Sequence, residues 1–330
     1  MKPSLRVGVV GVGHLGSRHA QIYAALPGVR LAGVCDIQPE RARALGRQLG
    51  CPSFTDCRRL LDQVDAVSLA VPTSAHAPIA LPCLRRGIHV LIEKPLARTL
   101  AEADALLRAA AQHRCVLQVG HVERFNAAIQ AAFRRLTHPR FIEVHRLSPY
   151  PFRGTDVSVV LDVMVHDLDL IQLLVREPVT RIDAVGISVL SPSEDIANAR
   201  LRFAGGCIAN VTASRISDEA TRRFRVFQED NYLSIDSQAQ TVELAHKAGG
   251  RIQRVALPVN RRPPLQEELA AFVRAVAGGT PPPVSGAEGR AALALALRIE
   301  QAMRRVRCRS RGGTACRAGP SRGRIDNVII

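Results

Sequence analysis

The sequence predicts an α/β fold, in which a doubly wound parallel sheet is followed by an α+β domain built on a mostly antiparallel, open sheet. Two observations predict it. Strand-like and helical patterns alternate over the first 122 residues, as they do in parallel sheets. From residue 141 onward, several strand-like runs follow one another with glycine-rich turns between them, which is typical of antiparallel sheets. With 330 residues, the chain is long enough for two hydrophobic cores.

The first strand, Leu5–Val10, runs directly into a glycine motif and then a helix over Ser17–Ala25. In this G-x-G-x-x-G motif, Gly11 permits a tight turn, Gly13 lets the backbone approach a pyrophosphate, and Gly16 lets helix and strand pack closely. The helix N-terminus then faces the phosphates. The context predicts a Rossmann dinucleotide site. The loop residues assigned to it are Gly11, Gly13, His14, Leu15 and Gly16.

The second strand, Val29–Cys35, ends in Asp36, twenty residues after Gly16. A carboxylate at that distance accepts hydrogen bonds from the ribose hydroxyls of NAD and repels the 2′-phosphate of NADP. NAD is therefore the expected cofactor. Arg41, five residues further on, can lie over the adenine or meet a 2′-phosphate, and the sequence leaves both roles open.

The alternation continues through three more strands. Its elements are the helix Pro39–Leu49, the strand Ala66–Val71, a helix ending at Arg86, the strand His89–Ile92, the helix Thr99–His113 and the strand Val116–Val119. Pro72, Thr73 and His76 follow a strand whose end lies beside the end of His89–Ile92. We expect them to touch the nicotinamide, and the alternative is a simple turn.

An acid, a base and a proline end the His89–Ile92 strand. Pro95 cannot donate to a sheet, so Glu93 and Lys94 are left at the carboxyl end of the strand, where open α/β sheets bind ligands. Lys94 is one of only three lysines among 45 lysine and arginine residues. Because arginine is the usual cation in this chain, a lysine here indicates that the position requires an ammonium rather than a guanidinium. We expect Glu93 and Lys94 to contact the cofactor. The alternative is a surface ion pair.

A helical pattern over Val159–Val175 places Asp162, His166 and Asp169 on one face, at i, i+4 and i+7. Apolar residues flank that face, so these polar groups need partners. A structural role is favoured for Asp169 and a catalytic role for the other two. The ordinary pKa of a histidine suits it to take the hydroxyl proton of an alcohol, so His166 is the candidate base. Asp162 orients it or holds a substrate hydroxyl, and Lys94 polarises the carbonyl oxygen.

We expect the domains to span residues 1–122 and 123–303, with the final helices free to pack back on the first domain. Residues 304–330 hold eight arginines and one acid without a helical or strand period, so we expect a basic, disordered tail. The elements expected after residue 122 are the helices Phe125–Leu136, Val159–Val175, Leu265–Ala277 and Ala287–Met303, and the strands Phe141–Leu147, Ile182–Leu190, Ala197–Phe203, Cys207–Ala213, Phe224–Phe227, Tyr232–Ile235 and Val242–Ala245.

The composition argues against several classes of protein. A net charge of +16 invites nucleic-acid binding, but three tyrosines and no tryptophan leave little for base stacking. A basic surface that attracts an anionic substrate is the preferred interpretation. The chain shows no apolar run long enough for a membrane span, no signal peptide and no C-x-x-C pair among its eight cysteines. We expect a cytoplasmic protein without a metal site and without a nucleic-acid or membrane partner.

Three motifs in this order, Gly11–Gly16, Glu93-Lys94-Pro95 and Asp162-x-x-x-His166-x-x-Asp169, resemble those of the Gfo/Idh/MocA family of NAD(P)-dependent sugar oxidoreductases. The resemblance covers residues 5–303. It implies that Lys94, Asp162 and His166 are the catalytic residues, and that the open sheet forms a homodimer or homotetramer. One departure is Met164, which stands where the family usually has a glycine. The substrate pocket is therefore expected to differ from that of inositol dehydrogenases.

Within the family, residues 140–149, 153–157 and 195–200 look most like members that oxidise the 3-hydroxyl of UDP-N-acetylglucosamine to a 3-keto sugar for lipid A biosynthesis. Such a substrate carries a pyrophosphate, which arginine binds bidentately, although each arginine can equally be an ordinary surface residue. Oxidation of a free sugar or inositol-type polyol stays open, as does a non-catalytic dinucleotide-sensing role. The residues expected to bind the substrate are His121, Arg124, Asn126, Arg146, Arg153, Asp162 and His166.

Overall fold

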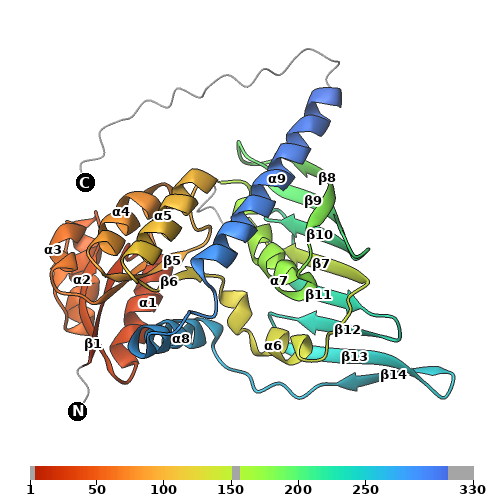
Figure 1. The fold of residues 1–330 in the computed structure, drawn as a ribbon, viewed down its shortest axis with the longest axis horizontal. Helices are drawn as coiled ribbons and strands as arrows, with labels where there is room; N and C mark the ends of the chain where they lie inside the picture. The colour runs from red at the N-terminus through yellow and green to blue at the C-terminus, as the bar shows by residue number, and fades with distance from the viewer. Residues whose placement is uncertain (1–3, 151–156, 311–330) are drawn as a thin grey trace.

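The structure, a computed structural model, describes residues 4–150 and 157–310. It confirms the predicted fold class, because a parallel sheet flanked by helices is followed by a domain built on a mostly antiparallel sheet. Figure 1 shows the parallel sheet and its helices at one end of the molecule and the antiparallel sheet at the other. The long helix α9 (Gly286–Ser310) runs along both.

Sheet A is parallel, with its six strands in the order β3-β2-β1-β4-β5-β6. Its strands are β1 (Leu5–Val10), β2 (Val29–Cys35), β3 (Ser53–Phe54), β4 (Ala66–Leu69), β5 (His89–Glu93) and β6 (Leu117–Gly120). The strand order reverses between β1 and β4, which is where doubly wound folds bind ligands. The sequence patterns predict all of these strands except β3, whose two residues are too few to show a period.

Helices cover both faces of sheet A. One face packs against α1 (His14–Ala25), α2 (Pro39–Leu49) and α8 (Pro264–Gly278), and the other against α3 (Cys57–Leu61), α4 (Thr73–Arg85), α5 (Leu100–Gln112) and α9. Local signals set the helix ends. α2 has a proline in its first turn and ends at Gly50, whose φ is 63°. At the start of α5, the Thr99 side chain accepts a hydrogen bond from the amide of Glu102.

Sheet B has eight strands in the order β14-β13-β12-β11-β7-β10-β9-β8. Neighbouring strands are antiparallel, except that β7 and β10 are parallel. Its strands are β7 (Phe141–Leu147), β8 (Val179–Ile187), β9 (Ile196–Phe203), β10 (Ile208–Ser214), β11 (Thr221–Phe227), β12 (Asn231–Asp236), β13 (Thr241–Ala248) and β14 (Arg251–Ala256). The sequence patterns do not predict β14, because all of its residues are exposed and no apolar alternation marks it.

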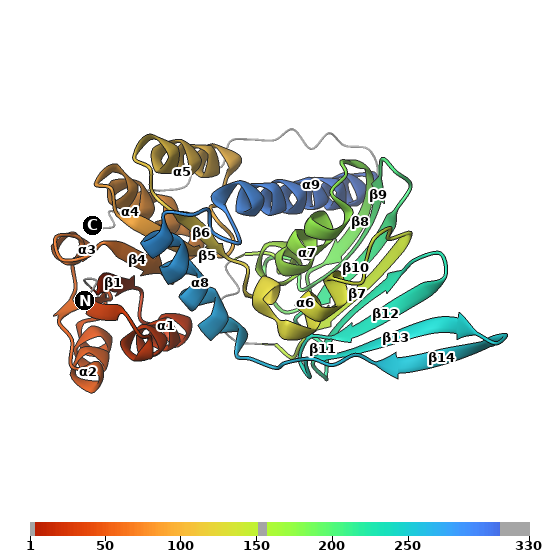
Figure 2. The ribbon, with the colours of Figure 1, turned by 60° about the horizontal axis from the view of Figure 1, so that its bottom comes forward.

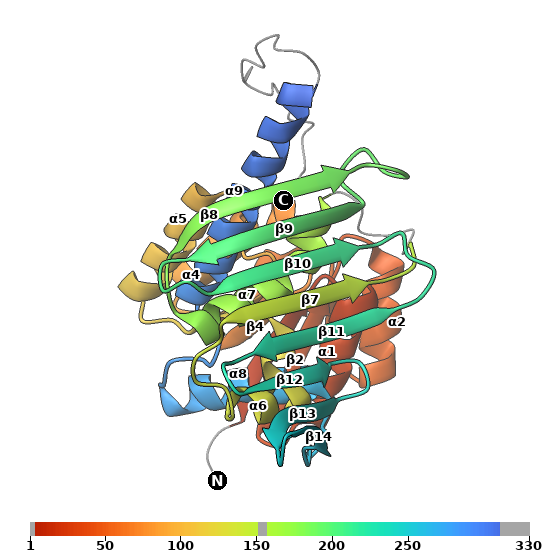
Figure 3. The same cartoon turned by 90° about the vertical axis from the view of Figure 1, so that its right-hand side faces the viewer.

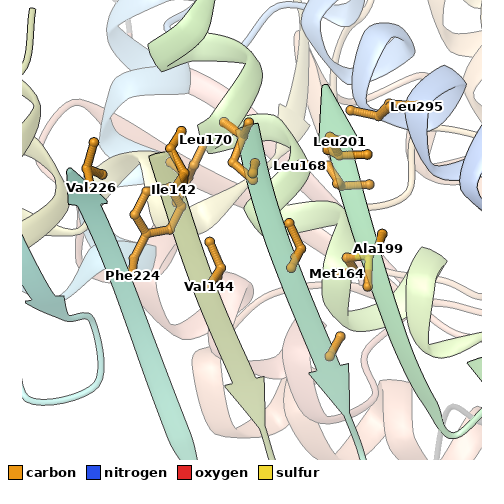
Figure 4. Packing of buried hydrophobic residues seen from close by; sticks show 14 of the residues in the cluster. Ile142, Val144, Met164, Leu168, Leu170, Ala199, Leu201, Phe224, Val226 and Leu295 are labelled. Atoms are coloured by element: carbon orange, nitrogen blue, oxygen red, sulfur yellow. The ribbon is translucent and has the colours of Figure 1, made fainter. Parts of the chain in front are cut away.

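One face of sheet B packs against α6 (Ala127–Phe133), α7 (Val165–Val175) and α9. Figure 4 shows this core, with Leu170 of α7 over Ile142 and Leu295 of α9 beside Leu201. Along β7 and β9, buried residues alternate with more accessible ones, as expected for a sheet with one buried face. Figure 3 shows the opposite face, which no described helix covers.

Helix α9 joins the two domains. It packs against α5 and β6 of the first domain and against α7 and β8 of the second, and Figure 2 shows it running from one to the other. We expected it to end at Met303, but the backbone stays helical to Ser310. Arginine is a good helix former, so the helix continues past its last buried turn. The rest of the expected tail, residues 311–330, lies outside the described residues.

Candidate active site

Lys94 and Asp162 meet at the junction of the two domains. Lys94 follows β5 at the carboxyl edge of sheet A. Its Nζ donates to the backbone oxygen of Asp162 at 2.6 Å and to Oδ1 of the same residue at 2.7 Å. The two side chains are 18% and 29% exposed, so the ammonium is held in place while still reaching solvent. An ammonium fixed in this way can stabilise negative charge on an oxygen bound beside it.

Asp162 lies in a short π helix, η2 (Val160–Met164), directly before α7. The regular α-helix expected over Val159–Val175 is therefore wrong in its first turn. At the end of η2, the amide of Val165 donates to the carbonyl of Val160, five residues back. Such turns are rare and often mark functional sites. Here the turn presents one backbone oxygen and one carboxylate to the same ammonium.

His166 lies in the first turn of α7 and is partly buried. Burial, followed by the positive charges of Lys94 and Arg146, holds the pKa of its imidazole well below the ordinary value. The ring is therefore neutral at neutral pH and can accept a proton. Its Nδ1 is enclosed without a hydrogen-bond partner among the described residues.

His121 does not take the substrate-binding place that we expected. Its side chain is buried, and its ring meets that of His166 edge to face, with the ring centroids 5.9 Å apart. Burial lowers the pKa of this imidazole too. His121 is therefore a second neutral ring that packs against His166 rather than a group that a sugar can reach.

The glycine loop has the geometry that a dinucleotide requires. A Cβ at Gly11, whose φ is 82°, would lie 2.6 Å from the carbonyl oxygen of Ala70, and one at Gly16 would lie 1.7 Å from that of Gly11. Neither position therefore accepts a side chain. Nothing lies within 4 Å of the Cβ position at Gly13, so the loop faces open space there. No side chain caps α1, which leaves its first-turn amides for a phosphate. His14 and Leu15 stand in that turn, so these residues fit bound NAD.

Asp36 stands at the end of β2 with its carboxylate against the loop. Its Oδ2 accepts from the amide of Val12 at 2.8 Å, and its Oδ1 accepts from the amide of Gln38 at 2.9 Å. These bonds fix an acceptor at the place expected for the ribose hydroxyls. Arg41 is exposed in the first turn of α2, so both of its expected roles stay open.

Glu93 has a partner that the sequence reasoning missed. Its Oε1 lies 3.2 Å from Nε2 of His19, and Nδ1 of His19 lies 2.7 Å from the hydroxyl of Ser68. His19 is three residues past Gly16, on the buried face of α1. A histidine on the buried face of the helix that follows the glycine motif could have indicated this partner from the sequence.

Pro72 and Thr73 stand at the start of α4, after the strand that neighbours β5, where we expected residues near the nicotinamide. His76 differs from that expectation. It is buried, and its two ring nitrogens each lie 3.0 Å from a backbone oxygen, that of Pro95 and that of Val71. His76 therefore joins two strand-end loops and has no nitrogen left for the cofactor.

Arg124, which we expected to bind a pyrophosphate, is instead saturated by carboxylates. Its Nε and Nη2 each lie 2.6 Å from an oxygen of Asp169, and its Nη1 donates to Glu288 at 2.7 Å. Asp169 is buried, as expected for a structural residue. The three side chains tie α7 to α9, so Arg124 holds the catalytic segment rather than the substrate.

Arg146 is likewise paired with carboxylates. It binds Asp167 through Nε at 2.8 Å and Nη2 at 2.7 Å, and Glu123 through Nη1 at 2.8 Å. All three residues are buried. This geometry does not support the predicted phosphate-binding role of Arg146, because its planar donors already face two carboxylates.

Asn126 also has a structural role instead of the predicted contact with the sugar. Its Oδ1 accepts from the amide of Ala128, and its Nδ2 donates to the backbone oxygen of Ser237 at 2.8 Å. The helix expected from Phe125 therefore begins at Ala127, after the 3₁₀ turn η1 (Val122–Phe125). The remaining predicted substrate residue, Arg153, lies outside the described residues.

Two kinds of feature are not found within residues 4–150 and 157–310. No group of three or more His, Cys, Asp or Glu side chains is placed there to hold a metal ion. None of the helices in these ranges combines the length and the apolar character that crossing a membrane requires.

Comparisons with known proteins agree with this fold. Residues 5–121 match the model of an oxidoreductase family with an NAD-binding Rossmann fold, and residues 127–234 match the Gfo/Idh/MocA C-terminal domain. The chain is 38% identical over 309 residues to UDP-N-acetylglucosamine 3-dehydrogenase of Acidithiobacillus ferrooxidans. That alignment covers 91% of this chain and 97% of the relative. A solved structure of the same enzyme matches with a TM-score of 0.86 at 39% identity, over the same shares of the two chains.

More distant relatives share the fold. Myo-inositol 2-dehydrogenase of Thermotoga maritima is 28% identical, over 92% of this chain and 97% of the relative. The structure of levoglucosan dehydrogenase in complex with NADH matches with a TM-score of 0.82 at 21% identity, over 92% of this chain and 97% of that one. The family models and the 38% identical relative agree on one assignment, and the chain belongs to the Gfo/Idh/MocA family of NAD-binding oxidoreductases.

Proposed function

We propose that the protein uses NAD to oxidise the 3-hydroxyl of UDP-N-acetylglucosamine to a 3-keto sugar, which a later amination converts for lipid A biosynthesis. The observation that carries the proposal is the contact of Lys94 with the backbone oxygen and Oδ1 of Asp162, beside a neutral His166. The 38% identity over 97% of a relative with this activity supports the choice of substrate.

In this proposal the chemistry divides among three side chains. Bound NAD supplies the acceptor for the hydride. Lys94 donates a hydrogen bond to the 3-oxygen and stabilises the negative charge that develops there as the C–H bond breaks. His166 takes the hydroxyl proton. Asp162 holds the ammonium of Lys94 in place and aims it at the substrate.

A second candidate is the oxidation of a polyol, favoured by the 28% identity to myo-inositol 2-dehydrogenase. Met164 does not separate the two candidates as we expected, because its side chain is buried in the core over sheet B and does not line a substrate site (Figure 4). A dinucleotide sensor is less well supported, since it has no use for an ammonium held by two oxygens of Asp162.

The test is a substrate comparison. Purified protein is incubated with NAD and either UDP-N-acetylglucosamine, N-acetylglucosamine or myo-inositol, with a carbonyl trap to pull the equilibrium forward. We expect NADH absorbance to rise with the UDP-sugar, and borodeuteride reduction of the product to place deuterium at C3. Good oxidation of inositol or free sugar without oxidation of the UDP-sugar would contradict the proposal.

The role of Arg153 stays part of the proposal. Arg153→Ala should raise KM for the UDP-sugar much more than KM for NAD, because a pyrophosphate loses a bidentate partner. The matched control is Arg251→Ala on β14, which removes an exposed arginine far from Lys94. Equal KM values for the UDP-sugar in the two variants would remove Arg153 from the site.

We also propose that the chain forms a homodimer or homotetramer through the outer face of sheet B. No described helix covers this face, and Val185 and Ile187 of β8 are 49% and 56% exposed on it. Light scattering at assay concentration tests this, and a monomer would contradict it. The cytoplasmic location expected from the sequence likewise stays a prediction.

A further inference from the structure

A layer of buried polar side chains lies between sheet A and the helices α1 and α8. Ser68 of β4, Leu91 of β5 and Gln118 of β6 are in register, so their side chains share one face of the sheet. Glu93 is two residues beyond Leu91 and therefore points to the same face. The helices add His19 and Tyr23 from α1 and Glu268 from α8. Glu93 is 8% exposed, and the other five polar residues are fully buried.

The partners within this layer are unevenly distributed. His19 lies between Glu93 and Ser68, as described above, and Nε2 of Gln118 donates to the backbone oxygen of Glu268 at 3.2 Å. Both carboxyl oxygens of Glu268 lack a hydrogen-bond partner among the described residues. A buried carboxylate without donors is strongly unfavourable, whereas the protonated acid carries no charge to desolvate.

The charges around Glu268 point the same way. Burial, together with the nearby negative charge of Glu93, raises the pKa of Glu268 well above the ordinary value. Burial also raises the pKa of Tyr23, so its hydroxyl stays neutral. α8 packs against η1 as well, but Glu123 and Arg124 of that turn are paired with other residues. No described cation offsets a charge on Glu268.

We propose that Glu268 is a neutral carboxylic acid within the same buried layer as Glu93, and that it is a positioning residue of the cofactor site. A protonated carboxyl group can donate towards a nearby carboxylate, which an ionised one cannot do. Glu93 directly precedes Lys94 and receives the Lys94 amide at 3.3 Å on Oε2. In this proposal Glu268 orients the residue that supports Lys94 without placing a second charge near it. The inference rests on NAD binding and not on the identity of the sugar.

The first test uses the proton that Glu268 keeps in the folded state. In the unfolded chain Glu268 releases this proton above the ordinary glutamate pKa of about 4.3. Between that pH and the raised pKa of the folded protein, the native state therefore binds one more proton than the unfolded state. The unfolding equilibrium constant of the wild type should therefore rise about tenfold per pH unit from this group alone. Glu268→Gln removes the effect. We expect its melting temperature to exceed that of the wild type, by a margin that grows with pH.

The matched control is Glu267→Gln, on the same helix. Glu267 is partly exposed and lies 3.6 Å from Arg262, so its replacement should give no stabilisation that grows with pH. If Glu268→Gln behaves like Glu267→Gln, Glu268 is not held neutral and the proposal is wrong.

The second test separates a positioning role from a merely structural one. Glu268→Gln keeps a neutral donor, so its Kd for NADH, measured by fluorescence without any sugar, should stay close to that of the wild type. Glu268→Leu fills a similar volume without a donor, and its Kd should rise about tenfold or more. Wild-type NADH affinity in a folded Glu268→Leu protein would overturn the role at the cofactor site. Failure of the UDP-sugar assay would leave both results intact.

Discussion

Replacing Lys94 by methionine removes the ammonium and keeps an unbranched apolar stem. The variant loses both hydrogen bonds to Asp162, whose side chain is 29% exposed and can be hydrated instead. Ion pairs with this much access to water contribute about 1 kcal/mol or less. We therefore expect the melting temperature to fall by only about 2–4 °C. No water can replace the donor at the reacting oxygen, and the loss of one such donor lowers kcat roughly 10²–10³-fold, or about 3–4 kcal/mol.

The assay is NAD reduction under saturating substrate, paired with NADH binding by fluorescence. NADH affinity should change by less than about twofold, since the lost interaction serves the chemical step. Lys247→Met, which removes an exposed lysine on β13, is the control. Adding Asp162→Asn to the Lys94 variant should lower kcat little further, because residues that act as one unit are not additive. Turnover close to wild type, or a loss of NADH binding that parallels the loss of turnover, would refute the assignment.

Three further predictions concern Asp36, Arg146 and His166. Asp36→Ala should narrow a preference for NAD over NADP, because it removes negative charge where the 2′-phosphate would lie; kcat/KM for the two cofactors checks this, and a wild-type preference for NADP would contradict it. Arg146→Met should lower the free energy of unfolding by about 3–5 kcal/mol, since the carboxylates of Asp167 and Glu123 are left buried without their partner; an unchanged denaturation midpoint would speak against it. The lowered pKa of His166 keeps its ring unprotonated, so kcat/KM for oxidation should stay level as pH falls through about 6.5; a rate that halves near that pH would show an unperturbed imidazole.

Sequence patterns predicted those parts of the site that depend only on neighbouring residues in the chain. Gly11 and Gly16 have no room for a side chain, and that need is written into a six-residue motif. Lys94 stands at a strand end that Pro95 enforces, and the pairing of Lys94 with Asp162 agrees with the roles inferred for them. The π turn around Asp162 was not predictable, because it involves a contact with a side chain 68 residues earlier.

The residues assigned wrongly depend on partners that the sequence does not identify. A guanidinium suits phosphate and carboxylate equally well, so Arg124 gave no sign that it binds Asp169, 45 residues away, and Glu288, 164 residues away. The sequence analysis did not distinguish the buried Glu268 from its partly exposed neighbour Glu267. A usable signal existed, because it lies three residues after Leu265 and four before Phe272, on the apolar face of its helix.

The cover that α8 gives to sheet A has a consequence for how the protein is made. Leu91 shares a buried cluster with Leu269 and Phe272 of α8, so this part of the first domain is completed by residues from near the end of the chain. A ribosome that has passed residue 120 needs on the order of 10–30 s to reach residue 278. Throughout that interval the apolar face around Leu91 and the acid Glu93 lack their cover. The dinucleotide-binding unit is thus incomplete until α8 has been made, and a fragment ending at residue 122 should aggregate rather than fold.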